Sequence, residues 1–212
     1  MTPVALPRPL TPEDATSLSG DLTWRHVPFE VTGTLFRSRI AHPLAFREPV
    51  GAAPAQIIFL RHAEKPDVGP ELKERGQERA HALVKLFTTD PRVLEHGPVA
   101  VIYAMKQAKA GSSIRAIQTV TPTARALGLT LDTRFTRDEI PAVVQALLAD
   151  PRATGKTVVV CWEHDAIPQI VKALGWRDAP KDWPGKAYDR LWVLDLTDGR
   201  PTRFRDLPQK IR

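Results

Sequence analysis

From residue 57 onward, short continuous apolar runs alternate with apolar residues that recur at helical spacing. Runs of four to six residues rich in β-branched side chains are typical of strands buried on both faces of a parallel sheet. Apolar residues three and four positions apart are typical of amphipathic helices. The expected strands are residues 57–60, 99–104, 157–162 and 190–194, with a short strand at 129–131. The expected helices are residues 72–87, 114–127, 138–149 and 166–174.

Glycine, proline and serine residues indicate where these expected helices begin, bend and end. Gly76 lies inside the first one, where glycine costs about 1 kcal/mol against alanine, and it indicates a close approach by another element. Ser112 or Ser113 is expected to cap the second helix. Pro122 should kink that helix or divide it into two, and Gly128 should end it.

Residues 1–54 are an N-terminal extension whose pattern predicts little regular structure. Pro3, Pro7, Pro9 and Pro12 argue against an early helix or strand, although residues 23–36 are compatible with a short strand or hairpin. We expect the extension to pack across the following domain or to be partly disordered. Residues 55–212 are expected to form that domain.

Composition narrows the class of protein. Apolar residues make up 42% and charged residues 25% of 212 positions, which is usual for a globular domain. The formal charge of +6 favours anionic ligands, but the basic residues are scattered, so nucleic acid binding is not expected. Cys161 is the single cysteine, and neither a signal peptide nor a membrane-spanning run is found. We expect a cytoplasmic protein without membrane or nucleic acid partners.

Polar side chains follow two of the expected strands at their carboxyl ends. Arg61 and His62 follow the run 57–60, and His164 comes shortly after the run 157–162. Arg115 lies in the first turn of a helix that follows a third strand. Ligands of open α/β sheets bind at the carboxyl ends of strands, and a helix N-terminus suits an anion. A lone surface arginine or a hydrogen-bonding histidine is common, whereas two of each at strand ends or helix starts indicate a site.

The order of these segments resembles the histidine phosphatase superfamily, also called phosphoglycerate mutase-like, in its first branch. The segment Arg61-His62-Ala63-Glu64 is similar to the family's Arg-His-Gly motif and the glutamate that often follows it. Residues 72–80 are similar to the next helix of the family, and residues 115–119 to its second arginine with a Gln-Thr pair. His164 corresponds to the second histidine. The resemblance covers roughly residues 55–195.

Three features depart from the family pattern. Ala63 replaces a glycine where backbone approaches phosphate, and the loop before Arg115 is longer and more basic than usual. Asp165 follows the second histidine, where the first branch normally has glycine and the acid phosphatase branch has a proton-donating aspartate.

The resemblance implies an α/β fold, a three-layer α/β/α sandwich with a mostly parallel central sheet. It also implies a metal-independent phosphatase that hydrolyses a phosphomonoester through a phosphohistidine on His62, with no cofactor. Arg61, Arg115 and His164 would hold the three equatorial phosphate oxygens, whose charge must be stabilised in the transition state.

The proton donor to the leaving oxygen stays open between Asp165, Glu139 and Asp138. Glu64 is expected to brace Arg61 through an ion pair rather than to react. The substrate is a small phosphorylated molecule or a phosphoprotein. Residues 106–113 and 177–188 are expected to wall the site together with the extension.

Three alternatives use the same residues differently. A mutase would move phosphate between hydroxyl groups of one substrate. A non-catalytic protein would bind phosphorylated ligands and is suggested by the positive charge and by Ala63. A metal site could be assembled from His62, Glu64, Glu163 and His164, whose side chains are suitable ligands.

Overall fold

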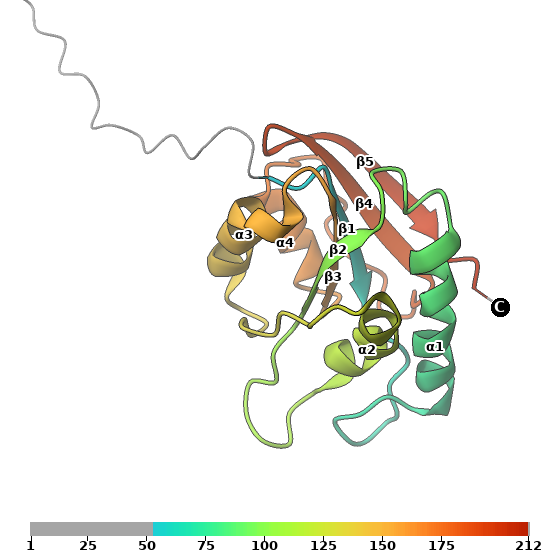
Figure 1. Ribbon diagram of the computed structural model, residues 1–212. Helices are drawn as coiled ribbons and strands as arrows, with labels where there is room; N and C mark the ends of the chain where they lie inside the picture. The colour runs from blue at the N-terminus through green and yellow to red at the C-terminus, as the bar shows by residue number, and fades with distance from the viewer. Residues whose placement is uncertain (1–52, 212) are drawn as a thin grey trace, which may run out of the picture. The chain divides into compact units, whose positions relative to one another are not determined.

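The computed structural model describes residues 53–211, so the extension at residues 1–54, including the hairpin considered at 23–36, lies almost wholly outside the described residues. The elements alternate along the chain as the apolar pattern predicts (Figure 1). In order they are β1 (Gln56–Arg61), α1 (Glu74–Thr89), β2 (Val99–Ala104), α2 (Arg115–Leu127), α3 (Ile140–Ala149), a 3₁₀ turn (Pro151–Ala153), β3 (Thr157–Trp162), α4 (Ile167–Ala173), β4 (Arg190–Thr197) and β5 (Arg200–Pro208).

The strands form one five-stranded sheet in the order β2-β3-β1-β4-β5. β2, β3 and β1 are parallel to one another. On the other side of β1, β4 pairs antiparallel with β1, and the edge strand β5 pairs antiparallel with β4. β1 and β3 pair in continuous register from Gln56 opposite Thr157 to Arg61 opposite Trp162. β1 and β3 therefore have their carboxyl ends side by side, which places the residues after β1 next to those after β3.

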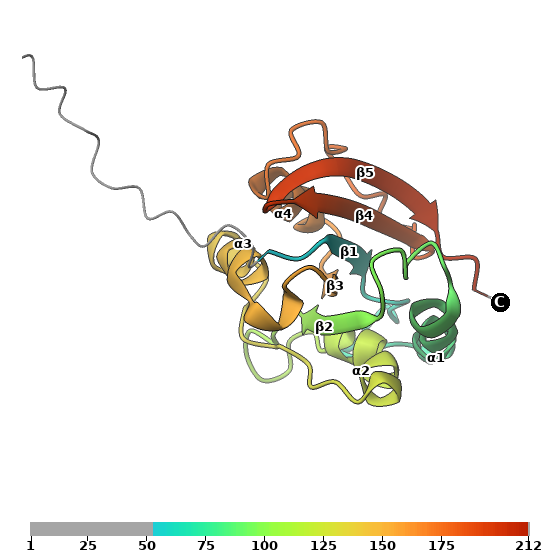
Figure 2. The same cartoon turned by 45° about the horizontal axis from the view of Figure 1, so that its top comes forward.

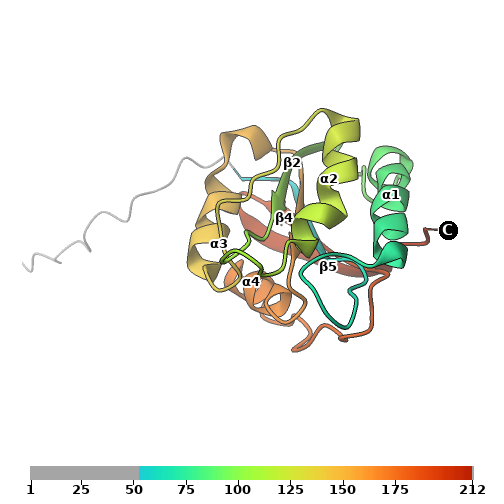
Figure 3. The ribbon, with the colours of Figure 1, turned by 90° about the horizontal axis from the view of Figure 1, so that it is seen from below.

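Helices cover both faces of the sheet. Figures 2 and 3 show α1 and α2 on one side of the strands and α3 and α4 on the other. This is the three-layer α/β/α arrangement that the family resemblance implies. It explains why β1 and β3 have continuous apolar runs, since every residue of both strands is buried.

Several helix ends differ from the sequence-based expectation, and α3 begins at Ile140, two residues after its expected start. α1 begins at Glu74, two residues after the expected start. Ile114, and not a serine, is the N-cap of α2, although the Ser113 hydroxyl accepts a 3.4 Å hydrogen bond from the Arg115 amide. Pro122 lies inside α2 without dividing it, and Gly128 ends the helix in the left-handed conformation with φ of 66°.

Gly76 confirms the predicted close approach. A β-carbon at this position would lie 2.4 Å from the backbone oxygen of Glu64, which is closer than real β-carbons come. The same oxygen accepts a hydrogen bond from the Lys73 amide at the start of α1. Glycine here lets α1 lie against the segment that leaves β1.

The sequence analysis misses β5. The strand is half-exposed, rich in arginine and paired only with β4. Asp198 and Gly199 join the two strands with φ values of 50° and 73°, as a tight hairpin turn requires. The expected short strand at 129–131 is reduced to a single bridge between Tyr103 and Asp132.

None of the helices within residues 53–211 combines the length and apolar character needed to cross a lipid bilayer.

Candidate functional site

The residues after β1 and β3 form a group that we call the histidine site, made of Arg61, His62, Glu163 and His164. The His62 amide donates to the Trp162 carbonyl at 3.2 Å, so the strand pairing continues up to the first histidine. One carboxylate oxygen of Glu163 lies 3.8 Å from Nε2 of His62 and 3.7 Å from Nδ1 of His164. Parallel pairing thus brings two segments about 100 positions apart into contact.

His62 is held in one tautomer. Its Nδ1 lies 2.7 Å from the carbonyl oxygen of Ala63, and a carbonyl only accepts, so Nδ1 carries the proton in this contact. In the neutral ring, Nε2 then has a free lone pair. The Ala63 amide donates to the Thr119 hydroxyl at 2.8 Å, which itself donates to the Arg115 carbonyl at 2.7 Å. The backbone beside His62 is therefore fixed to α2.

Arg61 is buried, with 2% of its surface exposed, beneath a segment from the C-terminal part of the chain. Its Nη1 donates to the Gly185 carbonyl, and its guanidinium carbon lies 4.0 Å from the centre of the Tyr188 ring. Burial lowers the pKa of Arg61, and Tyr188 and Glu163 offset part of this effect. Nε is buried and has no hydrogen-bond partner within residues 53–211.

Glu163 is ionised in the folded protein. Its contact with the His62 ring is the largest cause that lowers the pKa of Glu163 to about 2, and His164 and Arg137 add to it against the effect of burial. The negative charge therefore lies beside both imidazole rings at neutral pH. The sequence analysis includes Glu163 only among ligands of a metal site.

His164 is half-buried, and its Nδ1 has no hydrogen-bond partner in the described part of the chain. Burial and the neighbouring Arg61 guanidinium lower the pKa of His164, although Glu163 and Asp165 act in the opposite direction. His164 is therefore mainly neutral at pH 7. A buried polar atom without a protein partner is able to bind a ligand or water.

Arg115 begins α2, as the sequence predicts, but its side chain is engaged elsewhere. Its Nε donates to the Glu71 carbonyl at 3.1 Å, and Nη2 donates to the Gly69 carbonyl. Nη1 is 3.4 Å from the Ser113 hydroxyl. In this state Arg115 ties the loop between β1 and α1 to the start of α2.

Two of the three candidate proton donors share one arginine, and the third binds a threonine. Arg137 binds Asp165 through Nη2 and Asp138 through Nη1. Glu139 accepts hydrogen bonds from the amide and hydroxyl of Thr136, which lower its pKa. Asp165 lies beside His164, whereas Asp138 is 82% exposed.

The predicted ion pair between Glu64 and Arg61 does not form, so this prediction is wrong. Glu64 instead accepts two hydrogen bonds from Arg79, at 2.9 and 2.8 Å, and lies 3.5 Å from Arg75. Burial opposes these contacts, but the pKa of Glu64 is lowered overall by Arg79. α1 passes close to Glu64 because of Gly76, and this brings the α1 arginines within reach.

That pairing also removes Glu64 from the alternative metal site. Among the described residues, ligand atoms of Glu163, His164 and Asp165 lie within 4.8 Å of one another. Their oxygen and nitrogen donors suit a divalent cation. One Asp165 oxygen, however, already binds Arg137.

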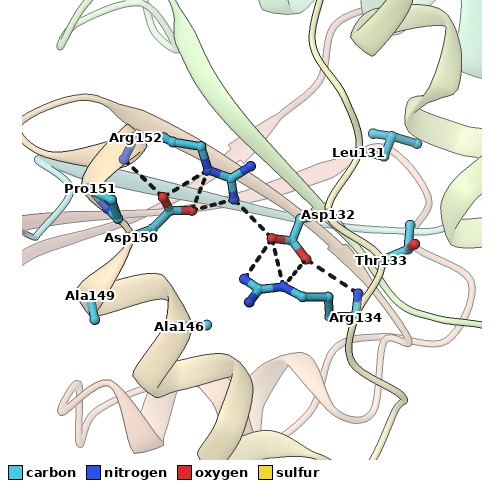
Figure 4. Close-up of a pocket in the computed structure, with 9 residues that line it drawn as sticks. All are labelled: Leu131, Asp132, Thr133, Arg134, Ala146, Ala149, Asp150, Pro151 and Arg152. Carbon is cyan, nitrogen blue, oxygen red and sulfur yellow. Dashed lines mark hydrogen bonds and ion pairs between the residues drawn. The ribbon is translucent and has the colours of Figure 1, made fainter.

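A cavity of about 720 Å³ lies away from the histidines, between the segment after α2 and the end of α3 (Figure 4). Its charged residues are Asp132, Arg134, Asp150 and Arg152, which we call the β2-edge cluster. Both arginines bind Asp132, and Arg152 also binds Asp150. The buried Tyr103 hydroxyl donates to Asp150 at 2.7 Å. All four charges are paired within the cluster.

Sequence reasoning misses four residues around the histidine site. Gly185 and Tyr188 fall in the expected wall 177–188, but nothing in their spacing indicates contact with Arg61. Arg137 and the role of Glu163 are missed as well. Glu163 could have been found, since it lies between the end of β3 and His164 in the sequence.

No protein-family model and no curated protein matches this sequence. Solved structures do match. A structure of the protein histidine phosphatase SixA complexed with tungstate aligns with a TM-score of 0.50 and 14% identity, over 73% of this chain and 97% of that one. Phosphoglycerate mutase from Bacillus anthracis str. Sterne aligns with a TM-score of 0.52 and 13% identity, over 73% and 93%.

The chain has the fold of histidine phosphatases and phosphoglycerate mutases. This confirms the fold that the sequence resemblance implies. At such low identity the match concerns the fold, and what the histidine phosphatase fold does in this chain depends on the geometry of its own residues.

Proposed function

We propose that this protein is a metal-independent phosphatase that hydrolyses a phosphomonoester through a phosphohistidine on His62. The observation that carries the proposal is the state of His62. Its Nδ1 is held by the Ala63 carbonyl, which leaves the lone pair on Nε2. Arg61 Nε and His164 Nδ1, both buried and without partners among residues 53–211, supply unused polar atoms beside that ring.

In the first step, Nε2 of His62 attacks phosphorus and the bond to the leaving oxygen breaks. Arg61 and His164 donate to equatorial oxygens, where negative charge must be stabilised. Arg115 is the third proposed phosphate ligand. Its guanidinium must leave the carbonyls of Gly69 and Glu71 to act in this way.

The leaving oxygen takes a proton from Asp165 in this proposal. Asp165 is chosen over Asp138 and Glu139 because it follows His164 directly and contributes to the electrostatic environment of that ring. In the second step, water attacks phosphorus, the bond to Nε2 breaks and phosphate forms. The proton from water returns to the Asp165 carboxylate.

The test is hydrolysis of an aryl phosphate without added metal, followed by alkaline quenching and mass spectrometry of the peptide that contains His62. Turnover with a phosphate transiently on His62 supports the proposal. Turnover without modification of His62 contradicts the covalent step. Tungstate binding without turnover would instead support a non-catalytic binder of phosphorylated ligands.

The role of Asp165 has a separate test. Asp165→Asn should slow hydrolysis of an alkyl phosphate by about 10²-fold or more, since a poor leaving group needs the proton. Hydrolysis of a nitrophenyl phosphate should change much less. Equal rates of wild type and variant on the alkyl substrate would exclude Asp165 as the acid and direct attention to Glu139.

A further inference from the structure

The segment from Trp183 to Tyr188 reaches the histidine site from the C-terminal part of the chain. Its first residue, Trp183, is anchored in the core. Trp183 is buried with its ring 4.8 Å from that of Trp192 on β4. Its Nε1 donates to the Ala187 carbonyl at 2.8 Å. The Ala187 amide donates to the Pro184 carbonyl at 2.9 Å, which closes a four-residue turn.

This turn contacts both sides of the site. The Gly185 carbonyl accepts a hydrogen bond from Arg61. A β-carbon on Gly185 would lie 3.6 Å from Nε2 of His164, an ordinary contact distance. The Tyr188 ring lies 4.0 Å over the Arg61 guanidinium and 6.3 Å from the centre of the His62 ring.

The Tyr188 ring face and the Gly185 carbonyl restrict where the Arg61 guanidinium can lie. A guanidinium under an aromatic face is attracted by the ring electrons, while its N–H groups point outward in its own plane. One of these groups is held by Gly185, and Nε has no partner within residues 53–211. The ring and the carbonyl therefore hold the guanidinium from two sides, while the Nε–H donor keeps no partner among residues 53–211.

We propose that Tyr188 is a positioning residue that orients Arg61 toward the phosphoryl group. The inference rests on the proposed phosphate role of Arg61. Tyr188 acts through its ring face and not through its hydroxyl. An aromatic side chain at this position should therefore preserve the effect, and an aliphatic side chain of similar size should not.

The experiment compares Tyr188→Phe with Tyr188→Leu. Phe135→Leu is a matched control, since Phe135 stacks under another arginine, Arg134, at 5.1 Å. We expect Tyr188→Leu to weaken tungstate binding and to lower kcat/KM by about tenfold, mainly through kcat, with Tyr188→Phe restoring most of both. Phe135→Leu should leave tungstate affinity unchanged.

A direct readout is the NMR signal of the Arg61 Nε–H group, assigned by its loss in Arg61→Lys. In the wild type it should exchange slowly and move on tungstate addition. In Tyr188→Leu it should exchange faster at an unchanged melting temperature. A general loss of stability would lower the melting temperature of Tyr188→Leu and of Phe135→Leu alike.

Failure of the inference and failure of the proposed function can be told apart. Tungstate affinity that is equal in wild type and Tyr188→Leu overturns the positioning role, whether or not aryl phosphate is hydrolysed. Absence of turnover with weaker tungstate binding by Tyr188→Leu overturns the phosphatase and supports the positioning role. A wild type that binds no tungstate overturns both.

Discussion

The β2-edge cluster and the histidine site both bring charged side chains together, but they differ in how those charges are paired. In the cluster, two aspartates and two arginines pair with one another and with Tyr103. In the histidine site, Arg61 Nε and His164 Nδ1 lack partners in the described structure. The cluster lines a cavity of about 720 Å³, yet the unpaired polar atoms lie elsewhere.

The difference shows that the volume of a cavity and the presence of unpaired polar atoms able to bind a ligand are separate properties. A closed network of ion pairs mainly fixes the chain, here the segment at Asp132 against the end of α3. A buried donor without a partner costs free energy, about 1–3 kcal/mol for a polar group, that a ligand can recover. The following predictions test whether these two regions divide stability and function between them.

The largest expected effect is on turnover. His62→Ala should lower kcat by at least about 10³-fold, because no other group replaces an attacking nucleophile. The melting temperature should fall as well, because the contact that lowers the pKa of Glu163 is lost, so kcat is compared per folded enzyme. His81→Ala, at an exposed histidine of α1, is the control and should keep full activity. A His62→Ala enzyme with more than a tenth of wild-type kcat would reject His62 as nucleophile.

Glu163→Gln should affect both stability and binding. A pKa lowered from 4.5 to about 2 means that the ionised carboxylate stabilises the folded state above about pH 5 and loses this contribution as pH falls toward 2. We expect the variant to lose about 1–3 kcal/mol of unfolding free energy at pH 7. The difference from wild type should vanish near pH 2 in urea titrations.

The same substitution should tighten tungstate binding by roughly tenfold, because it removes a negative charge beside both histidine rings that repels the anion. Lower stability together with higher affinity would show that the Glu163 carboxylate lies close enough to the bound anion to repel it. Loss of both would indicate that Glu163 only holds the histidines in place.

Asp150→Asn should act on stability alone. Arg152 and the Tyr103 hydroxyl lower the pKa of Asp150 from 3.8 to about 2 although burial opposes them, so its contribution is present above about pH 4 and is lost as pH falls through 2. The variant should lose about 1–2 kcal/mol at pH 7 in urea titrations and keep wild-type kcat/KM. A tenfold change in kcat/KM would break the proposed division between the two regions.

The smallest effect concerns the pH dependence of binding. Burial and Arg61 keep His164 neutral in the free protein, whereas a bound anion favours the imidazolium. Sulfate, which does not titrate in this range, should bind several-fold more tightly at pH 6 than at pH 8. Glu163, Asp165 and His62 also influence this ring, so His164→Gln is the necessary comparison. Calorimetry of the variant should show a flat pH profile.

Local pattern was sufficient for most of the fold. The continuous apolar runs at β1, β2 and β3 follow from burial on both faces, and helical spacing located α1 to α4. β5 was missed because an edge strand with one partner needs no apolar run. Its Arg203 and Arg205 pair with Asp195 and Glu95 instead. The Asp198-Gly199 turn was a local signal that could have revealed it.

The sequence by itself determined that arginine and histidine follow β1 and that a second histidine follows β3, since strand ends can be recognised from local apolar patterns. Only the tertiary structure decided which charges meet. Glu64 turned to Arg79 because α1 comes close at Gly76, and Tyr188 came to lie over Arg61 from 127 positions away. Such contacts depend on how distant elements pack, and local spacing along the chain carries no record of them.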